Sequence, residues 1–437
     1  MISRRVFLRD GGLALVSLGF APSFLARTVA AAGSATAGAQ LGARATGRSR
    51  QKVLIAIFQR GAVDGLNVVV PFGEKTYYQA RPTIAIPQPG FPDGALDLDG
   101  FFAFHPRLAP LKPLYDAHQL AIVHACGSPD STRSHFDAQD YLETATPGVK
   151  STQDGWLNRC LQARHAPSLP SGGEHWGEGA GGSAFRAVAL TPQLPRSLQG
   201  LAPALAMSQI GQFSVRADAR IGTSFEEQYA AAADTVLNGA GREAFAAIRT
   251  LKSADPQRYQ PARGVEYPRS AYGQALKQIA QLVKAGVGLE VAFAESSGWD
   301  HHVNEGSTQG QLAIRLDDFA RGIAALVTDL GDRMADTVIL TMSEFGRAVS
   351  ENGNRGTDHG HGNAMLAIGG PVQGGRVYGT WPGLARDQRF EGRDLAVTTD
   401  FRDVFGEVVT RHMGIGDPRQ IFPGYDITPS KFVGFLA

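Results

Sequence analysis

Short, mainly apolar runs recur along the chain, and amphipathic helical patterns lie between them. The runs are Lys52–Phe58, Leu120–Ala125, Ala187–Leu190, Leu289–Ala294, Thr337–Met342 and Ala364–Ile368. A strand has this composition when both faces of its sheet are covered. The helical patterns are Pro106–Ala117, Ser134–Thr144, Phe225–Leu251, Gly273–Lys284, Gln311–Leu330 and Asp400–Met413. This alternation predicts an α/β fold with helices on both faces of a central sheet.

The composition excludes several classes of protein. Hydrophobic residues make up 43% and charged residues 19% of 437 residues, which is typical of a globular protein. The formal net charge is +1, so the sequence carries no electrostatic signature of nucleic-acid binding. Cys126 and Cys160 are the two cysteines of the sequence, which excludes a disulfide scaffold and a thiolate zinc cluster.

The first 32 residues have the pattern of an export signal. Arg4 and Arg5 precede an apolar run from Gly11 to Leu25, and small residues follow at 30–32. The run is too short to span a membrane. The paired arginines indicate export by the twin-arginine (Tat) machinery, and an ordinary Sec signal is the alternative. We therefore expect a periplasmic or secreted protein.

The rest of the chain has no obvious internal boundary. Residues 33–50 are small, polar and aperiodic, and we expect them to form a disordered leader. No shift in composition follows residue 50, so residues 51–437 are expected to form a single domain. No stretch there reaches the roughly 18 apolar residues of a membrane-spanning helix, so we expect no transmembrane helix in the mature protein.

Carboxylates and histidines follow several of the predicted strands. Asp64 follows the first strand, where α/β sheets bind ligands, although an Asp-Gly pair also forms turns. Asp300 and His302 follow the strand Leu289–Ala294. If the backbone is extended there, they point to one side and His301 points away. A carboxylate and an imidazole on one side can bind a divalent metal, although such a cluster also occurs by chance on loops.

Two further loops have the same character. Glu344 follows the strand Thr337–Met342, and Asp358, His359 and His361 precede the strand Ala364–Ile368. Because several strand ends carry such residues, the sequence favours a metal site over solvated loops.

A hydroxyl-rich loop joins the strand Leu120–Ala125 to the next helix. It contains Ser131, Thr132, Arg133 and Ser134. A helix N-terminus suits an oxyanion, and a hydroxyl beside a metal could act as a nucleophile. The competing interpretation is that Ser134 caps the helix, with Asp137 in its first turn.

Five motifs occur together in one order: FQRGAVDGLN, SHFDAQDY, GWDHH, SEFGR and GTDHG. With the Tat leader they make the chain resemble, over about residues 52–415, an exported bacterial family known as "domain of unknown function 1501". That resemblance implies the alkaline-phosphatase-like group of folds, which includes sulfatases and phosphodiesterases. It implies a mixed, mostly parallel sheet with paired divalent metals at the carboxyl ends of strands. It also implies a nucleophilic Ser, Thr or modified Cys at a helix start.

The resemblance assigns roles by position. It implies that Asp64 is the metal-binding aspartate of the first strand, and that Asp300 and His302 form the later metal-binding pair. Glu344 stands where relatives have the aspartate of Ser-Asp-His-Gly, and Phe345 replaces their histidine. The final ligand region is matched by Asp358, His359 and His361. Because Phe345 has no imidazole, the resemblance leaves open two ions, one ion or none.

Three functions remain open at this stage. The first is a metal-dependent hydrolase of a small anionic phosphate or sulfate ester, with Arg60, Arg133 or Arg347 holding the anion. The second is a catalytically degenerate relative that binds a metal or an anion in the cell envelope. The third is a structural or assembly role. The donors suit Zn, Mn or Fe, and Ca or Mg would fit if carboxylates dominate.

Overall fold

The computed structural model describes residues 51–164, 185–210 and 259–437. The export signal, the leader and the expected helix Phe225–Leu251 lie outside the described residues. Among the described residues no helix is long and apolar enough to cross a membrane. Cys126 and Cys160 are both free thiols in the core.

Among the described residues, nine strands form a central sheet. Its strands lie in the order β11-β5-β10-β9-β1-β8-β6-β7, with β12 beside β5. Their bounds are β1 Val53–Arg60, β5 Leu120–Gly127, β6 Ala187–Ala189, β7 Leu205–Ala206, β8 Val291–Ser297, β9 Thr337–Met342, β10 Asn363–Gly369, β11 Arg376–Tyr378 and β12 Thr399–Asp400. Strand β10 runs antiparallel to both β5 and β9, whereas the other described pairings are parallel. The predicted mixed, mostly parallel α/β sheet is therefore confirmed.

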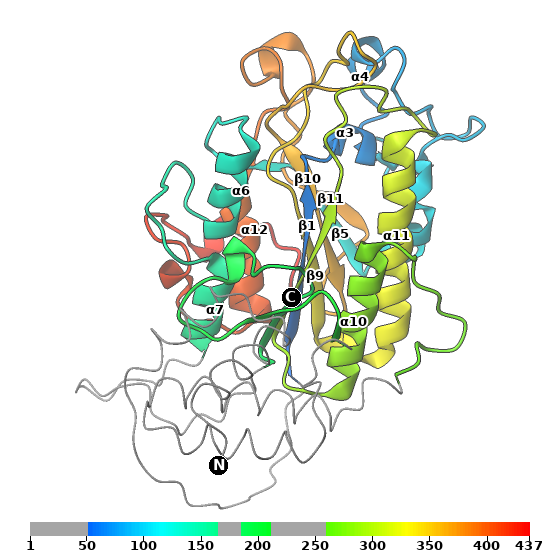
Figure 1. Ribbon diagram of the computed structural model, residues 1–437. Helices are drawn as coiled ribbons and strands as arrows, with labels where there is room; N and C mark the ends of the chain where they lie inside the picture. The colour runs from blue at the N-terminus through cyan, green and yellow to red at the C-terminus, as the bar shows by residue number, and fades with distance from the viewer. Residues whose placement is uncertain (1–50, 165–184, 211–258) are drawn as a thin grey trace, which may run out of the picture.

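Helices cover both faces of this sheet, as Figure 1 shows. One face carries α6 (His135–Thr144), α7 (Trp156–Arg164) and α12 (Phe401–Glu407). The other carries α10 (Ala271–Ala285) and α11 (Gln311–Leu330). Each layer packs its own cluster of buried apolar side chains against the sheet, as expected for strands that are apolar on both faces.

Two predicted helices begin or end differently from the sequence pattern. The segment expected as one helix from Pro106 is a 3₁₀ turn (Pro106–Leu111) followed by α5 (Lys112–Asp116). Pro110 lies inside the turn, and proline cannot donate the backbone hydrogen bond that an α-helix requires. The last helix continues past α12 as a π-helical turn, Val408–His412.

A small second sheet and two short helices lie between β1 and β5 in the chain. The sheet pairs β2 (Val69–Val70), β4 (Ala103–Phe104) and β3 (Leu96–Asp97). The helices are α3 (Gly65–Val68) and α4 (Lys75–Ala80).

The strand register brings the motif-bearing loops to one edge of the central sheet. Arg60 at the end of β1 pairs with Ser297 at the end of β8, and Phe58 pairs with Met342 at the end of β9. Because β10 is antiparallel, its first residue, Asn363, pairs with Cys126 near the end of β5. The loops after β1, β5 and β8 and the loop between β9 and β10 therefore share this edge.

Candidate metal site

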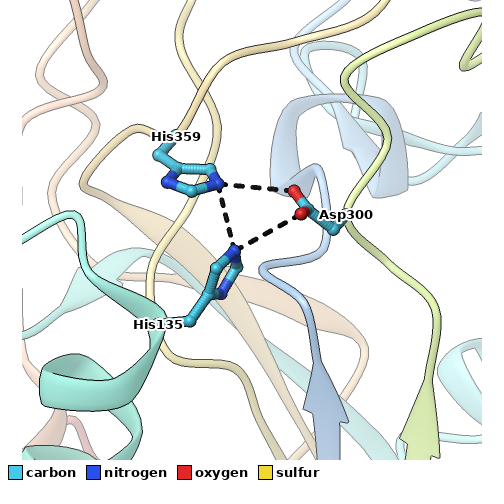
Figure 2. Close-up of side chains that lie close together, drawn as sticks. All are labelled: His135, Asp300 and His359. Atoms are coloured by element: carbon cyan, nitrogen blue, oxygen red, sulfur yellow. Dashed lines mark hydrogen bonds and ion pairs between the residues drawn. The ribbon is translucent and has the colours of Figure 1, made fainter.

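Three histidines and one aspartate converge at this edge. They are His135 at the start of α6, Asp300 and His302 after β8, and His359 before β10. Figure 2 shows the side chains of His135, Asp300 and His359 pointing toward a common centre. We call the four residues the histidine–aspartate cluster.

The donor atoms of the cluster are close together. His359 Nε2 lies 3.0 Å from His135 Nε2 and 2.9 Å from His302 Nε2. The Asp300 carboxylate lies 3.6, 3.1 and 3.4 Å from Nε2 of His135, His302 and His359 respectively. Two ligands about 2.0–2.1 Å from a tetrahedral zinc ion would be roughly 3.3 Å apart, so the separations among His135, Asp300 and His359 fit a metal of that size.

Hydrogen bonds at Nδ1 of His135 and His359 determine which ring nitrogen carries the proton. His135 Nδ1 lies 2.8 Å from Glu344 Oε1, and His359 Nδ1 lies 2.8 Å from the carbonyl oxygen of Arg133. Both partners are acceptors, so each Nδ1 carries the hydrogen, and in the neutral form of each ring the lone pair is at Nε2. Two lone pairs 3.0 Å apart repel unless a proton or a metal ion lies between them, which is the donor chemistry of a metal site.

Electrostatics differ among the cluster residues. The hydrogen bond from the Glu344 carboxylate raises the pKa of His135, whereas burial lowers the pKa of His359. For Asp300, burial acts to raise the pKa, but the hydrogen bond and charge of Arg347 lower it overall. A deprotonated carboxylate and an unprotonated imidazole are the forms that bind metals.

Glu344 is placed behind the cluster rather than in it. Its Oε1 also accepts hydrogen bonds from the Gly61 N–H (2.8 Å) and Gln139 Nε2 (2.9 Å). Burial alone would raise its pKa, but these donors and His135 lower it. The sequence predicted Glu344 as a metal ligand, whereas in the structure its carboxylate orients a histidine.

Arg347 anchors the other side of the cluster. Its fully buried guanidinium donates to Asp300 Oδ1 at 2.6 Å. It also donates to the carbonyl oxygens of Ala62 (2.6 Å), Thr357 and Trp299 (both 3.1 Å). Gly61 packs against the same segment, because a Cβ at this position, where φ is +114°, would lie 2.8 Å from the Asp300 nitrogen. The first loop and the Asp300 loop are thus held together before any ligand binds.

The structure brings some of the predicted ligands together and not others. Asp300, His302 and His359 lie in the cluster, and Asp358 lies beside it, 3.5 Å from His302 Nδ1. The ring of His361 instead stacks on Phe390, with centroids 4.2 Å apart.

Asp64 also lies apart from the cluster. Its carboxylate is bound by the guanidinium of Arg81, so the structure differs here from the expected metal-binding aspartate. His301 is buried, in line with the expected alternation of side chains along the loop.

The cluster residue that the sequence patterns missed is His135. It lies one position after Ser134 and within the quoted SHFDAQDY motif. Asp300 with His302, and His359 with His361, are pairs spaced i and i+2, and His135 has no such partner. Its position at the first residue of a helix after a strand end was the available signal.

The three arginines expected to hold an anion already have partners. Arg60 pairs with Glu295 (2.6 Å) and Glu143 (3.0 Å). Arg133 pairs with Glu391 and Asp394 (both 2.6 Å). Arg347 is buried among the contacts given above, so its guanidinium is unavailable to a ligand from solvent.

The hydroxyl-rich loop leads directly into the cluster. Ser134 is the N-cap of α6, and its Oγ accepts from the Asp137 N–H over a long 3.5 Å. Thr132 Oγ1 accepts from the Ser134 N–H at 3.2 Å, and Ser131 is exposed. Ser134 caps the helix, as one interpretation predicted. It also directly precedes His135 of the cluster, so its position is compatible with the other interpretation, a nucleophile.

Solvent reaches the cluster from one side. The side chains of Asp300 and His302 are 44% and 39% exposed. Three imidazoles with one carboxylate suit zinc and similar transition metals better than calcium or magnesium, which prefer oxygen ligands. The arrangement can therefore hold a transition-metal ion and still admit a small ligand.

Comparisons with known proteins identify the family and a distantly similar solved structure. The family described as "Protein of unknown function (DUF1501)" matches residues 51–422. No curated protein matches the chain. Among solved structures, the PsFucS1 sulfatase from Pseudoalteromonas sp. is similar at 14% sequence identity and a TM-score of 0.35, over 89% of this chain and 72% of that chain.

Proposed function

The chain belongs to the DUF1501 family of proteins of unknown function, and from its site we propose that it is a metal-dependent hydrolase of phosphate or sulfate esters. The histidine–aspartate cluster would hold one transition-metal ion. The observation that carries this proposal is the convergence of the Nε2 atoms of His135 and His359 on the Asp300 carboxylate, with His302 Nε2 2.9 Å from that of His359. The tautomers of His135 and His359 leave two lone pairs facing each other, which a cation would stabilise.

The metal would supply Lewis-acid polarisation of an ester oxygen. The chain's own residues do the positioning: Glu344 orients His135, the Arg133 carbonyl orients His359, and Arg347 holds Asp300. The positive N-terminal end of α6 begins at His135, where it would stabilise negative charge that develops on the ester.

Ser134 is our candidate for the nucleophile. Its hydroxyl belongs to the residue before His135, and the long hydrogen bond to the Asp137 N–H holds it only loosely. In the reaction, the hydroxyl oxygen would bond to phosphorus or sulfur and give its proton to solvent. The bond from phosphorus or sulfur to the alcohol oxygen would break, and that oxygen would take a proton from solvent. Water would then release phosphate or sulfate from the serine.

A metal analysis and an ester panel test the proposal. Purified protein is stripped with a chelator, reloaded with Zn²⁺ or Mn²⁺, and assayed for bound metal and for hydrolysis of phosphate and sulfate esters. We expect one ion per chain and metal-dependent turnover, and both should be lost in His359→Ala. The exposed His118, outside the cluster, gives the matched control His118→Ala. If the wild-type protein binds no metal ion after it has been incubated with Zn²⁺ or Mn²⁺, the metal centre is refuted.

A second candidate function rests on the arginines. Because Arg60, Arg133 and Arg347 are already paired and so do not hold an ester for attack, the protein could bind a metal ion without turnover. A metal-loaded protein that hydrolyses no ester would favour this reading.

Location is proposed from the sequence alone. The twin arginines at residues 4 and 5 and the apolar run that follows support export by the Tat machinery to the periplasm or beyond. A periplasmic or secreted hydrolase would meet ester substrates outside the cytoplasm.

A further inference from the structure

A second cluster of charged groups lies in the interior and involves the first-strand aspartate. The side chains of Asp64 and Arg81 are 2% and 0% exposed, and Glu305 is fully buried. Asp64 follows β1, Arg81 follows α4, and Glu305 precedes α11. Three ionisable groups so far from water need partners, because an isolated buried charge is very costly.

Oxygen atoms surround the guanidinium of Arg81. It donates to both carboxylate oxygens of Asp64 and to Asn67 Oδ1 at 2.7 Å. It also donates to the carbonyl oxygens of Ala348 and Val349, both at 2.9 Å. Carboxylate, amide and carbonyl oxygens are the ligands that calcium and magnesium use in proteins.

Glu305 adds an unused ligand to this cluster. Its Oε2 accepts a hydrogen bond from Thr357 Oγ1 at 2.8 Å, whereas its Oε1 is buried and has no N–H or O–H donor among the described residues. Burial and the nearby Asp64 carboxylate raise the pKa of Glu305 well above its usual range. Glu305 is therefore held uncharged beside Asp64, with which it shares a hydrogen bond, and the guanidinium of Arg81 balances the charge of Asp64.

We propose that Asp64, Glu305 and Asn67 form an interior cation site whose resident cation is the Arg81 guanidinium. The chain would then take one exchangeable metal ion, at the histidine–aspartate cluster, and none at Asp64. The count of one rests on the proposed function, whereas the assignment of Arg81 does not. A single exchangeable ion disagrees with the paired-metal arrangement that the sequence resemblance implied.

The interior site that holds the Arg81 guanidinium is also connected to the exposed cluster. Glu305 binds Thr357, whose carbonyl oxygen accepts from Arg347, and Arg347 holds Asp300. The interior site thus joins the loops that carry the exposed cluster. An arginine keeps this framework assembled whether or not metal is available.

Counting bound ions in Arg81 variants tests the proposal. Metal-free wild type, Arg81→Ala, Arg81→Lys and the double variant Arg81→Ala/Asp64→Asn are each incubated with excess Zn²⁺ or Mg²⁺, dialysed and analysed for metal and melting temperature. We expect wild type and Arg81→Lys to hold one Zn²⁺ and no Mg²⁺. Arg81→Ala should melt several degrees lower, gain one further ion and recover part of its melting temperature in Mg²⁺. The double variant should show no gain.

Each other outcome has a definite meaning. Two ions in the wild type would overturn the proposal, and so would an Arg81→Ala protein that gains no ion or responds to Mg²⁺ no more than wild type. A wild type without any ion would refute the exposed metal centre, while the Arg81→Ala comparison still decides the interior site. If Arg81→Ala does not fold, the ion count of wild type and Arg81→Lys remains decisive.

Discussion

Glu344 Oε1 lies 2.8 Å from His135 Nδ1, on the side of the imidazole that faces away from Asp300 and His359. The carboxylate also accepts from Gly61 and Gln139, so its position is fixed from three directions. A carboxylate in this relationship fixes the tautomer and orientation of a metal-binding histidine.

Replacing this carboxylate should weaken metal binding without unfolding the protein. Glu344→Gln leaves one acceptor oxygen for three donors, so His135 should lose its fixed orientation. We expect the affinity for Zn²⁺ to fall about 10–100-fold, measured by competition with a chromophoric chelator. Glu266→Gln, at an exposed position, is the matched control and should not change the affinity. An unchanged affinity in Glu344→Gln would remove His135 from the site.

Arg347 should contribute to stability as well as to the site. Arg347→Met leaves Asp300 without its partner and several buried carbonyl groups without a donor. Loss of one partner from such a buried network costs about 3–5 kcal/mol, which urea denaturation would measure. Arg321→Met removes an exposed arginine on α11 that pairs with Asp317, and it should cost less than about 0.5 kcal/mol. Equal losses in the two variants would contradict the role of Arg347.

Buried histidines far from the cluster should make the protein sensitive to acid. Burial lowers the pKa of His124 to about 4, and likewise that of His105. Since the unfolded chain binds these protons at about pH 6.5 and the folded one does not, stability present at pH 7 is lost as the pH falls toward 4.

This loss can be assigned to one residue. Each such histidine should reduce the unfolding free energy by about 2 kcal/mol between pH 7 and pH 5, and His124→Gln should reduce the pH dependence by that amount. Val123→Ala, in the same buried strand, should lower the unfolding free energy equally at both pH values. A pH dependence that is the same in His124→Gln and wild type would show that His124 does not titrate in this range.

The sequence predicted the sheet because its signal is local. The apolar run of β1 forms a strand buried on both faces, and the register with β8 and β9 then places their loops at one edge. The partner of each polar side chain was not predictable in the same way. Asp64 meets Arg81 and Glu344 meets His135, and either carboxylate could equally have met a metal. Which partner each carboxylate has depends on where α4 places Arg81 and on how α6 orients His135, and no short sequence pattern encodes either.

Export should depend on the twin arginines. Changing Arg4 and Arg5 together to lysine preserves the charge but removes the guanidinium pair of a Tat signal, so unprocessed precursor should accumulate in the cytoplasm. The processed wild-type protein should begin near Gly33, after the small residues at 30–32. Immunoblots of fractionated cells and N-terminal sequencing measure both. Exported protein that begins at Met1 would contradict the prediction.

Ser134 can be tested against a second helix cap in the same protein. Ser134 caps α6 beside the cluster, and Ser270 caps α10, where its Oγ accepts from the Gly273 N–H at 3.0 Å. Removing either cap should lower the unfolding free energy by about 1 kcal/mol. If Ser134 is the nucleophile, Ser134→Ala should abolish ester hydrolysis at unchanged metal content, whereas Ser270→Ala should keep its activity. If both variants lose the same stability and both remain active, Ser134 only caps its helix. The nucleophile would then be sought at Thr132, at Ser131 or in water.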